Sequence, residues 1–382
     1  MNNKGIVLAT ETECTGCSAC YNSCPTKSIK MVSSDEGFLY PLIMDTCVGC
    51  KKCENSCPIV NVNHNEIVKK RAYACINENI DTRLKSSSGG VFALLAHHIL
   101  KCGGVVFGAK FDVDTQSIIH TIIDKQENLD QIMRSKYAQS NIGKIFINVK
   151  KCLKDGQKVL FSGTPCQISG LQAFLGEKYD RLYLVDVICH GVPSDVLLLK
   201  YLKYICPKKN ITEMNFRDKK KGWTDYGMSL TTDRQTKWCS KDQDPYMQMF
   251  LRDFCLRESC YNCKTKENDC ADITLGDFWG IREVLPIIDD NKGTSLVITR
   301  TAKGEKLLEN IIDKCKCVEV SYEDAVKYNR SEYSSTQRPI ERDQFYKDLN
   351  QMSFKSMIKK YVPISWKEVI FSKLVELKII KE

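Results

Sequence analysis

The stretch CTGCSACYNSCP at residues 14–25 recurs as CVGCKKCENSCP at residues 47–58. Both copies have the form C-x2-C-x2-C-x3-C-P, so every cysteine and the proline keep the same spacing. Repetition of so specific a pattern is hard to explain by chance and predicts two equivalent halves of one small domain. The four thiolates in each copy are enough to hold a metal centre.

This spacing is the pattern of bacterial ferredoxins, in which the first three cysteines of a run bind one 4Fe-4S cluster. The fourth cysteine, which the proline directs away, binds the cluster of the other run. A pair of zinc knuckles is the alternative because C-x2-C also suits tetrahedral zinc, but a third close thiolate followed by x3-C-P favours iron and sulfide. The prediction is one cluster on Cys14, Cys17, Cys20 and Cys57, and a second on Cys47, Cys50, Cys53 and Cys24.

The segment between the two runs, KSIKMVSSDEGFLYPLI, predicts two short strands around a turn at residues 35–37. Such a hairpin is what a compact two-cluster ferredoxin fold needs. Two clusters side by side leave no substrate pocket. We therefore expect this module to carry single electrons between a partner protein and the rest of the chain.

Length and composition predict two or three globular domains, since the chain has 382 residues, of which 43% are hydrophobic and 27% charged. No apolar run approaches the ~18 residues that span a bilayer, and the opening lacks the apolar centre of a signal peptide, so we expect a cytoplasmic protein. Its 21 cysteines then favour metal ligands over disulfides. Clusters would offset much of the formal charge of +9, and the basic residues are dispersed, so nucleic-acid binding is not expected.

From about residue 63, strands and helices alternate, which predicts an α/β fold with a mixed sheet and helices on its faces. The small α+β bacterial-type ferredoxin domain precedes it, and a C-terminal helical tail follows. The tail from Phe354 is basic and amphipathic, so a membrane surface or a partner is an alternative to the favoured packing on its own domain. The expected domains are residues 1–62, 63–349 and 350–382.

Several local patterns predict individual elements of the larger domain. VVFGAKF and SIIHTIID predict a hairpin, and Ser321 is the expected N-cap of a helix with Asp324 three residues later. TSLVITRT and AKGEKLLENIID predict the last strand and helix. KSSSGGVFALLAHHILKCGG predicts a helix that starts near Gly89 or Gly90. Helix N-termini bind anions, so residues 86–90 are a candidate cofactor-phosphate site, although capping alone would explain the serines equally well.

Two further segments, KVLFSGTPCQISGLQAFL and RLYLVDVICHGVPSDVLLLKYLKYI, each predict a strand, a loop and a helix. In the first loop, Gly163 and Thr164 allow a ligand to approach the backbone closely, which is a weak signal by itself. Ligands in open α/β sheets gather beyond the strand ends. Cys166 and Cys189 occupy similar positions after their strands and are expected to face one site.

In this order after the two-cluster module, KSSSGGVFALL, RSKYAQSNIG, FSGTPCQISGLQ, DVICHGVPS, FRDKKKGW, SCYNC and ADITLGDFWG resemble motifs of the coenzyme F-420 hydrogenase/dehydrogenase beta-subunit family. The resemblance runs from Cys14 to about Leu349. It implies an FAD-binding oxidoreductase that exchanges a hydride with a deazaflavin and passes electrons to iron-sulfur clusters. Some members are associated with polysaccharide biosynthesis, so the family fixes the type of chemistry better than the substrate.

The resemblance also implies a third 4Fe-4S cluster beside the flavin, while Cys255 and Cys270 fall outside its motif. Lys136 would offset a pyrophosphate charge. His190, next to a cluster ligand, is a candidate proton donor, although the role of a hydrogen-bonded loop residue suits it slightly better. The implied cluster ligands are Cys166, Cys189, Cys260 and Cys263, and the implied flavin contacts are Ser87, Ser88, Gly89, Gly90, Ser135, Lys136, Tyr137 and Gln139.

The remaining cysteines show no grouping that suggests a metal, and we expect them to be buried or inert thiols. Within this set Cys315 and Cys317 are too close in sequence to chelate one metal comfortably. The set comprises Cys75, Cys102, Cys152, Cys206, Cys239, Cys315 and Cys317.

The leading hypothesis is an enzyme that moves electrons between a hydride donor or acceptor at FAD and a one-electron carrier. A non-catalytic electron-transfer subunit, a reductase of polysaccharide biosynthesis and a structural zinc protein are the alternatives. The sequence does not distinguish F-420 from another flat substrate, nor does it give the direction of electron flow, the partner or the oligomeric state.

Overall fold

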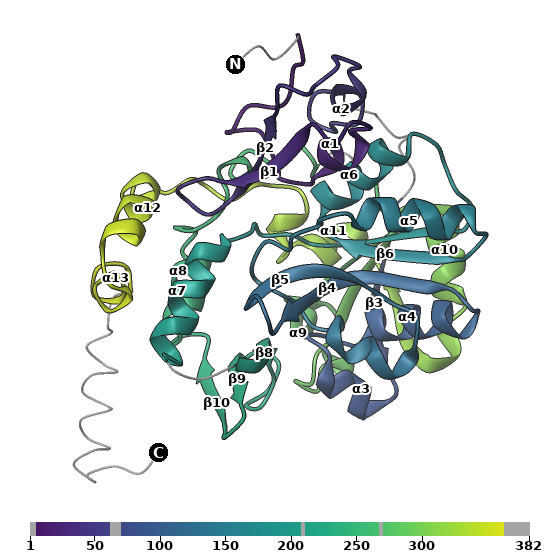
Figure 1. The fold of residues 1–382 in the computed structure, drawn as a ribbon. Coiled ribbons are helices and arrows are strands. Elements are labelled where there is room, and N and C mark those ends of the chain that lie inside the picture. The colour runs from purple at the N-terminus through teal and green to yellow at the C-terminus, as the bar shows by residue number, and fades with distance from the viewer. Residues whose placement is uncertain (1–4, 62–69, 208–210, 267–269, 363–382) are drawn as a thin grey trace.

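The computed structural model describes residues 5–61, 70–207, 211–266 and 270–362. The predicted boundary at residues 62–63 and the tail beyond residue 362 lie outside these ranges. In Figure 1 the N-terminal elements, in purple, lie at the top of the molecule next to α6.

The N-terminal region is a two-stranded antiparallel hairpin flanked by two short helices that carry cysteines of the two runs. Residues 29–33 pair with residues 39–43, which confirms the predicted hairpin. Each helix follows a residue with positive φ, Ser18 at 63° and Lys51 at 60°, so the two copies of the repeat adopt the same local turn. The elements are α1 (Ala19–Ser23), β1 (Ile29–Ser33), β2 (Leu39–Ile43) and α2 (Lys52–Asn55).

The larger region is built on an eight-stranded mixed sheet with the order β13-β3-β12-β11-β7-β6-β4-β5. Its four central strands, β11, β7, β6 and β4, run parallel, and antiparallel strands complete both edges. The strands are β3 (Arg71–Asn77), β4 (Val105–Asp112), β5 (Ser117–Ile123), β6 (Val159–Gly163), β7 (Leu182–Val187), β11 (Ile273–Asp277), β12 (Ser295–Thr299) and β13 (Cys315–Val320).

Helices cover both faces of this sheet, which confirms the predicted α/β class. One face packs against α4 and α10, and the other packs against α5 and α6 at one end and α9 and α11 at the opposite end. Short apolar strands buried on both faces are typical of such sheets. The helices are α3 (Ile80–Lys85), α4 (Val91–Lys101), α5 (Ile145–Lys154), α6 (Pro165–Leu175), α9 (Ile281–Val284), α10 (Ala302–Glu309) and α11 (Tyr322–Val326).

A separate hydrophobic cluster lies beside the sheet and joins a three-stranded sheet to four helices. The part of the C-terminal tail that the structure describes packs here: the ring of Phe354 lies 5.9 Å from that of Tyr201, and Tyr361 lies 4.9 Å from Phe345. The elements are α7 (Asp195–Ile205), β8 (Ile211–Asp218), β9 (Gly227–Thr232), β10 (Thr236–Ser240), α8 (Pro245–Leu251), α12 (Arg342–Gln351) and α13 (Phe354–Tyr361).

Most predicted elements are present, including the β4–β5 hairpin, the start of α4 after Gly90, and the Ser321 cap, whose side chain accepts a hydrogen bond from the Asp324 amide. The strand and helix predicted at residues 294–313 are present as β12 and α10. They are not the last elements of the sheet region, because β13 follows and pairs with β3 at the sheet edge. Its sequence, CKCVEV, lacks the apolar run that marks the central strands. Among the described helices, none combines the length and apolar character required to cross a bilayer.

Candidate functional site

The first three cysteines of the first run lie beside the last cysteine of the second run. Burial raises the pKa of the Cys20 thiol, and the nearby charges of Cys17, Cys14 and Cys57 raise it further. Burial also raises the pKa of Cys17 to about 12, again with contributions from Cys14 and Cys57. The chain thus brings together the four residues that the sequence pattern assigned to one cluster.

The second predicted set also combines the two runs, because Cys24 of the first run lies near Cys47 and Cys53 of the second. Burial raises the pKa of Cys53, and the charges of Cys24 and Cys47 raise it further. The sulfur of Cys24 accepts a hydrogen bond from the Ser28 amide at 3.2 Å. Backbone donors to the sulfurs are one of the means by which proteins stabilise iron-sulfur clusters. Cys50, the remaining member of the predicted set, is exposed.

The spacing of the sulfurs fits clusters better than zinc. A single tetrahedral zinc with Zn–S bonds of about 2.3 Å holds its sulfurs roughly 4 Å apart. Within the described ranges, sets of three or more potential ligand atoms that all lie within 4.8 Å of one another are confined to Cys75, Cys315 and Cys317. No three sulfurs of the two runs, among the described residues, therefore all lie as close together as a single zinc ion requires.

The residues assigned to a third cluster also converge, from two strand-end loops and the SCYNC segment. Burial raises the pKa of Cys189 to about 11 and that of Cys260 to about 12, and the charge of Cys263 contributes to both shifts. Burial raises the pKa of Cys166 as well, with further contributions from Cys263 and Cys189. The hydroxyl of Thr164 lies 3.1 Å from the Cys166 sulfur. Cys255, by contrast, is fully buried in the hydrophobic cluster beside the sheet.

Helix α6 connects this third set to the first one. Cys166 lies in its first turn, and Gly170 lies one turn further along. A β-carbon placed on Gly170 would be 2.8 Å from the sulfur of Cys17, so the absence of a side chain there lets the two regions approach closely. The charge of Cys17 also contributes to the raised pKa of Cys166. The two thiol sets are thus neighbours across the contact between the regions.

A cavity of about 600 Å³ opens beside the third set, within the size range of cofactor sites. Cys166, Cys189 and His190 line it at one end. Of the predicted cofactor contacts, Gly89 alone is absent from its wall, because Gly89 is buried against the Cys75 carbonyl. The predicted contacts that do line the cavity are Ser87, Ser88, Gly90, Ser135, Lys136, Tyr137, Gln139, Gly163 and Thr164.

Hydrogen bonds hold the serine-glycine loop at residues 86–90 in place. They use some of the donors and acceptors of this loop. The hydroxyl of Ser88 donates to the Thr294 carbonyl at 2.8 Å, and that of Ser87 accepts from the Ser135 amide at 2.8 Å. The Lys219 ammonium donates to the Ser88 carbonyl at 2.9 Å. Gly90 is the N-cap of helix α4 and has no side chain that could cap the helix. The first backbone amides of α4 can therefore donate hydrogen bonds to an anion.

The structure adds a histidine that the sequence analysis missed. His120 on β5 lines the cavity but is 95% buried by its own chain, since its relative exposure is 5%. One ring nitrogen, Nε2, lies 3.0 Å from the Ser162 carbonyl, while Nδ1 is buried and has no hydrogen-bond partner among the residues that the structure describes. Burial lowers the pKa of His120 to about 4. The alternation in SIIHTIID, which places His120 on the same side as Ile118, was the available signal.

A buried arginine and its aromatic neighbours form another part of the cavity wall. Arg217 donates to the Asp277 carboxylate at 3.1 Å, and its guanidinium lies 3.9 Å from the centre of the Tyr226 ring. Trp279 lies beside it and stacks on Trp223 at 5.0 Å between ring centres. Burial alone lowers the pKa of Arg217, but Asp277, Tyr137 and Tyr226 together raise it by more than this, so the guanidinium stays charged. This wall offers a cation and flat ring faces to a ligand.

His190 lines the cavity with its ring held from two directions. Its Nε2 bonds to the Asp253 carboxylate at 2.5 Å, and its Nδ1 lies 3.5 Å from the Ser331 hydroxyl. The hydrogen-bonded loop role expected from the sequence is therefore present. A carboxylate behind a histidine also fixes its tautomer, so the arrangement is compatible with proton transfer.

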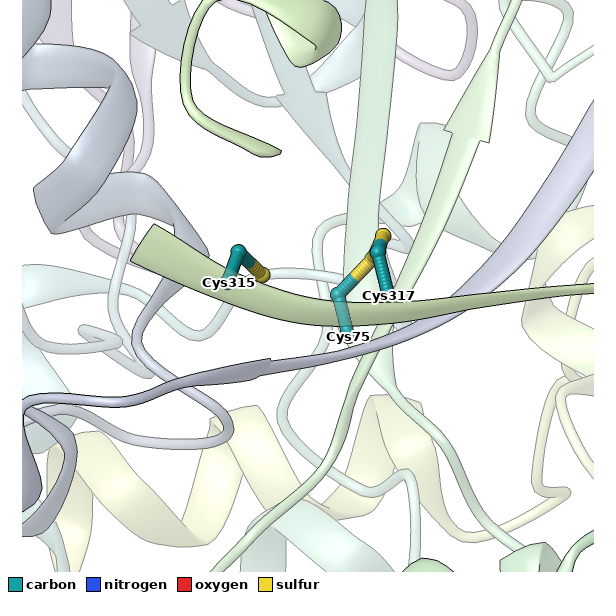
Figure 2. A group of neighbouring side chains, drawn as sticks. All are labelled: Cys75, Cys315 and Cys317. Carbon is teal, nitrogen blue, oxygen red and sulfur yellow. A yellow bond between two sulfur atoms is a disulfide. The ribbon is translucent and has the colours of Figure 1, made fainter. Parts of the chain in front are cut away.

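Three cysteines that we expected to lack any grouping lie together at the sheet edge. Figure 2 shows Cys75 of β3 bonded to Cys317 of β13, with Cys315 beside them. Cys75 and Cys317 stand directly opposite in the antiparallel pair, with their Cα atoms 4.3 Å apart, and Cys315 projects from the same face two residues earlier. The expectation of inert, ungrouped thiols was wrong for these three. Their separation by 242 residues left no local signal.

Two family models match different parts of this chain. Residues 7–64 match the family described as 4Fe-4S dicluster domain. Residues 156–325 match the family described as the C terminus of the coenzyme F-420 hydrogenase/dehydrogenase beta subunit. Two matches of different kinds therefore cover the cysteine runs and the loops of the third set.

The similar individual proteins are distant in sequence. A coenzyme F-420-dependent sulfite reductase from Methanocaldococcus jannaschii is 21% identical over 231 residues, or 59% of this chain. The match spans only 34% of that enzyme's length. A chain in a structure of the F-420-reducing NiFe hydrogenase complex from Methanosarcina barkeri is 14% identical, with a TM-score of 0.48, over 77% of this chain and 95% of that chain.

Proposed function

Because residues 156–325 belong to the coenzyme F-420 hydrogenase/dehydrogenase beta-subunit family and follow a 4Fe-4S dicluster domain, we propose that this chain is a flavin-dependent iron-sulfur oxidoreductase. The observation that carries the proposal is the thiol set at Cys166 and Cys189, which borders the large cavity on one side and Cys17 on the other. Bound FAD would exchange two electrons as a hydride and pass them on singly, as clusters require.

In this proposal the cavity binds the cofactor through groups on opposite walls. The uncapped N-terminus of α4 and the loop at residues 86–90 face the phosphates, with Lys136 as a nearby cation. The unpartnered Nδ1 of His120 is a hydrogen-bond acceptor for the cofactor when Nε2 donates to the Ser162 carbonyl. His190, oriented by Asp253, is the proposed proton donor or acceptor for a substrate.

The proposed electron route follows the thiol sets outward from the cavity. It runs from the set at Cys166 to the set at Cys17, and then to the set that includes the exposed Cys50. An exposed ligand at the far end suits contact with a one-electron partner protein. The domain limits at residues 1–62, 63–349 and 350–382 and the use of F-420 as the hydride carrier are part of the same proposal.

Anaerobic reconstitution with iron, sulfide and FAD tests this function. We expect about twelve iron atoms and one FAD per chain, and reduction of the clusters by a reduced deazaflavin without a partner protein. A content of about eight iron atoms per chain would mean that no cluster forms at Cys166. A full iron content without flavin would instead support a non-catalytic electron-transfer subunit, and zinc without iron would refute the proposal.

One pair of variants localises the third cluster. Cys263→Ala should lose about four iron atoms per chain and keep the two clusters of the cysteine runs. Cys102→Ala, at an exposed cysteine in the C-cap of α4, is the matched control and should keep all of them. Equal iron contents in the two variants would exclude Cys263 as a ligand.

A further inference from the structure

Arg257 has no role in the function proposed above, yet its side chain is wholly buried where the two regions meet. Its Nε donates to the Cys14 carbonyl at 2.6 Å, and one terminal nitrogen donates to the Leu39 carbonyl at 3.0 Å. The other terminal nitrogen donates to the Gln139 side chain at 3.0 Å, and Gln139 in turn donates to the Thr15 carbonyl at 2.8 Å. One guanidinium therefore joins a cluster-ligand loop to the cavity wall.

No carboxylate neutralises this buried charge within the part of the chain that the structure describes. Glu36 and Glu258, which lie in the contact between the two regions, both pair with Arg342, at 2.6 and 3.0 Å. The Tyr40 ring, 4.2 Å away, offers a weak cation–π contact. A buried charge is costly unless an opposite charge compensates it, so the site calls for an anion.

The position of Arg257 indicates which anions these are. Its backbone is three residues from Cys260, and its carbonyl accepts a hydrogen bond from the Cys260 amide at 2.9 Å. Its side chain reaches Cys14 of the first set, and a β-carbon on Gly16 would lie 2.7 Å from a guanidinium nitrogen. Gly16 therefore leaves room for the arginine in the loop between Cys14 and Cys17. The two thiol sets that flank the guanidinium both become anionic when they hold clusters.

We propose that Arg257 is the shared counter-ion and positioning residue of two clusters, the one held through Cys14 and the one held through Cys260. This inference rests on the proposed function. A fixed positive charge stabilises the reduced, more negative form of a nearby cluster, and burial keeps solvent from screening it. Arg257 therefore raises the reduction potentials of both clusters relative to that of the outer set with Cys50.

The test is a redox titration of the anaerobic holoprotein, with each cluster followed by electron paramagnetic resonance. In Arg257→Gln, we expect the equilibrium constants for reduction to fall about tenfold at two clusters, a shift of about 59 mV for each one-electron step. The outer cluster, assigned to Cys24, Cys47, Cys50 and Cys53, should not change. Lys264→Gln removes an exposed positive charge beside Cys263 and is the matched control, with expected changes below about threefold.

Arg257→Lys separates charge from hydrogen bonding and serves if Arg257→Gln does not fold. Retention of the wild-type constants within about threefold supports a counter-ion. A tenfold fall with lysine, unchanged constants with glutamine, or equal shifts in all three clusters would overturn the inference. A wild-type chain that binds no iron would overturn the proposed function as well, whereas full iron content with unaltered potentials would overturn only the role of Arg257.

Discussion

The N-terminal region and the sheet region are stabilised in different ways. The hydrophobic cluster of the N-terminal region contains only three buried residues, Ile6, Ile29 and Cys53, among those that the structure describes. The sheet region has an extensive core on each face and another beside α7. Small domains without an adequate core need metals or covalent links to fold stably. The difference indicates that the clusters of the cysteine runs are structural as well as redox-active.

The N-terminal region also depends on its neighbour. Its buried Phe38 packs into the cluster beside α7, and its Ala19 packs into the core under α6. Arg342 reaches from α12 to the hairpin turn and pairs with Glu36. Cluster binding and packing against the sheet region are therefore two contributions to the stability of the N-terminal region that can be tested separately.

Removal of iron should produce the largest difference in stability between the two regions. In the iron-free chain, we expect amide exchange in β1 and β2 to accelerate on the order of a thousandfold, because cluster binding stabilises the fold of this region. Exchange in β6 and β7 should stay slow. Hydrogen exchange followed by mass spectrometry checks this, and comparable acceleration in both regions would contradict it.

Loss of the contact between Arg342 and the hairpin turn should lower stability by a smaller amount. Arg342→Ala leaves Glu36 without its ion-pair partner and leaves Glu258 paired only with Arg338. Because the contact is largely buried, we expect the substitution to lower the free energy of unfolding by about 3 kcal/mol. Arg71→Ala, which removes ion pairs of an exposed arginine with Glu319 and Glu305, should cost about 1 kcal/mol or less. Urea unfolding of the reconstituted proteins measures both. Similar losses would mean that the contact adds nothing beyond an ordinary surface ion pair.

The smallest effect concerns the sheet region alone. Burial lowers the pKa of Lys136 to about 7, so between pH 7 and its ordinary value the unfolded chain binds more protons than the folded chain. Stability should therefore rise as the pH increases from about 7 to about 9, and Lys136→Met should abolish a rise on the order of 1 kcal/mol.

Thermal and urea unfolding of the iron-free chain at both pH values measure this rise. Lys154→Met, at the exposed end of α5, is the control and should keep it. Retention of the rise in Lys136→Met would assign it to another group.

Local sequence patterns were sufficient where neighbouring residues determine the structure. Such patterns predicted the two cysteine runs and the hairpin between them. They also predicted the strand-loop-helix units that contain Cys166 and Cys189. Predictions failed where partners are far apart in sequence. Cys75 and Cys317 are 242 residues apart, and Glu36 and Arg342 are 306 residues apart, so neither pair leaves a local trace. Arg257 was missed for the same reason.

The long reach of the Arg342–Glu36 pair has a consequence for biosynthesis. The N-terminal region leaves the ribosome first, but a partner that buries its hairpin turn is translated 306 residues later. At roughly 5–20 residues per second, this interval is on the order of 15–60 s. During that time the hairpin turn is without the cover of α12. The turn between β1 and β2 therefore reaches its final packing only after translation has passed Arg342.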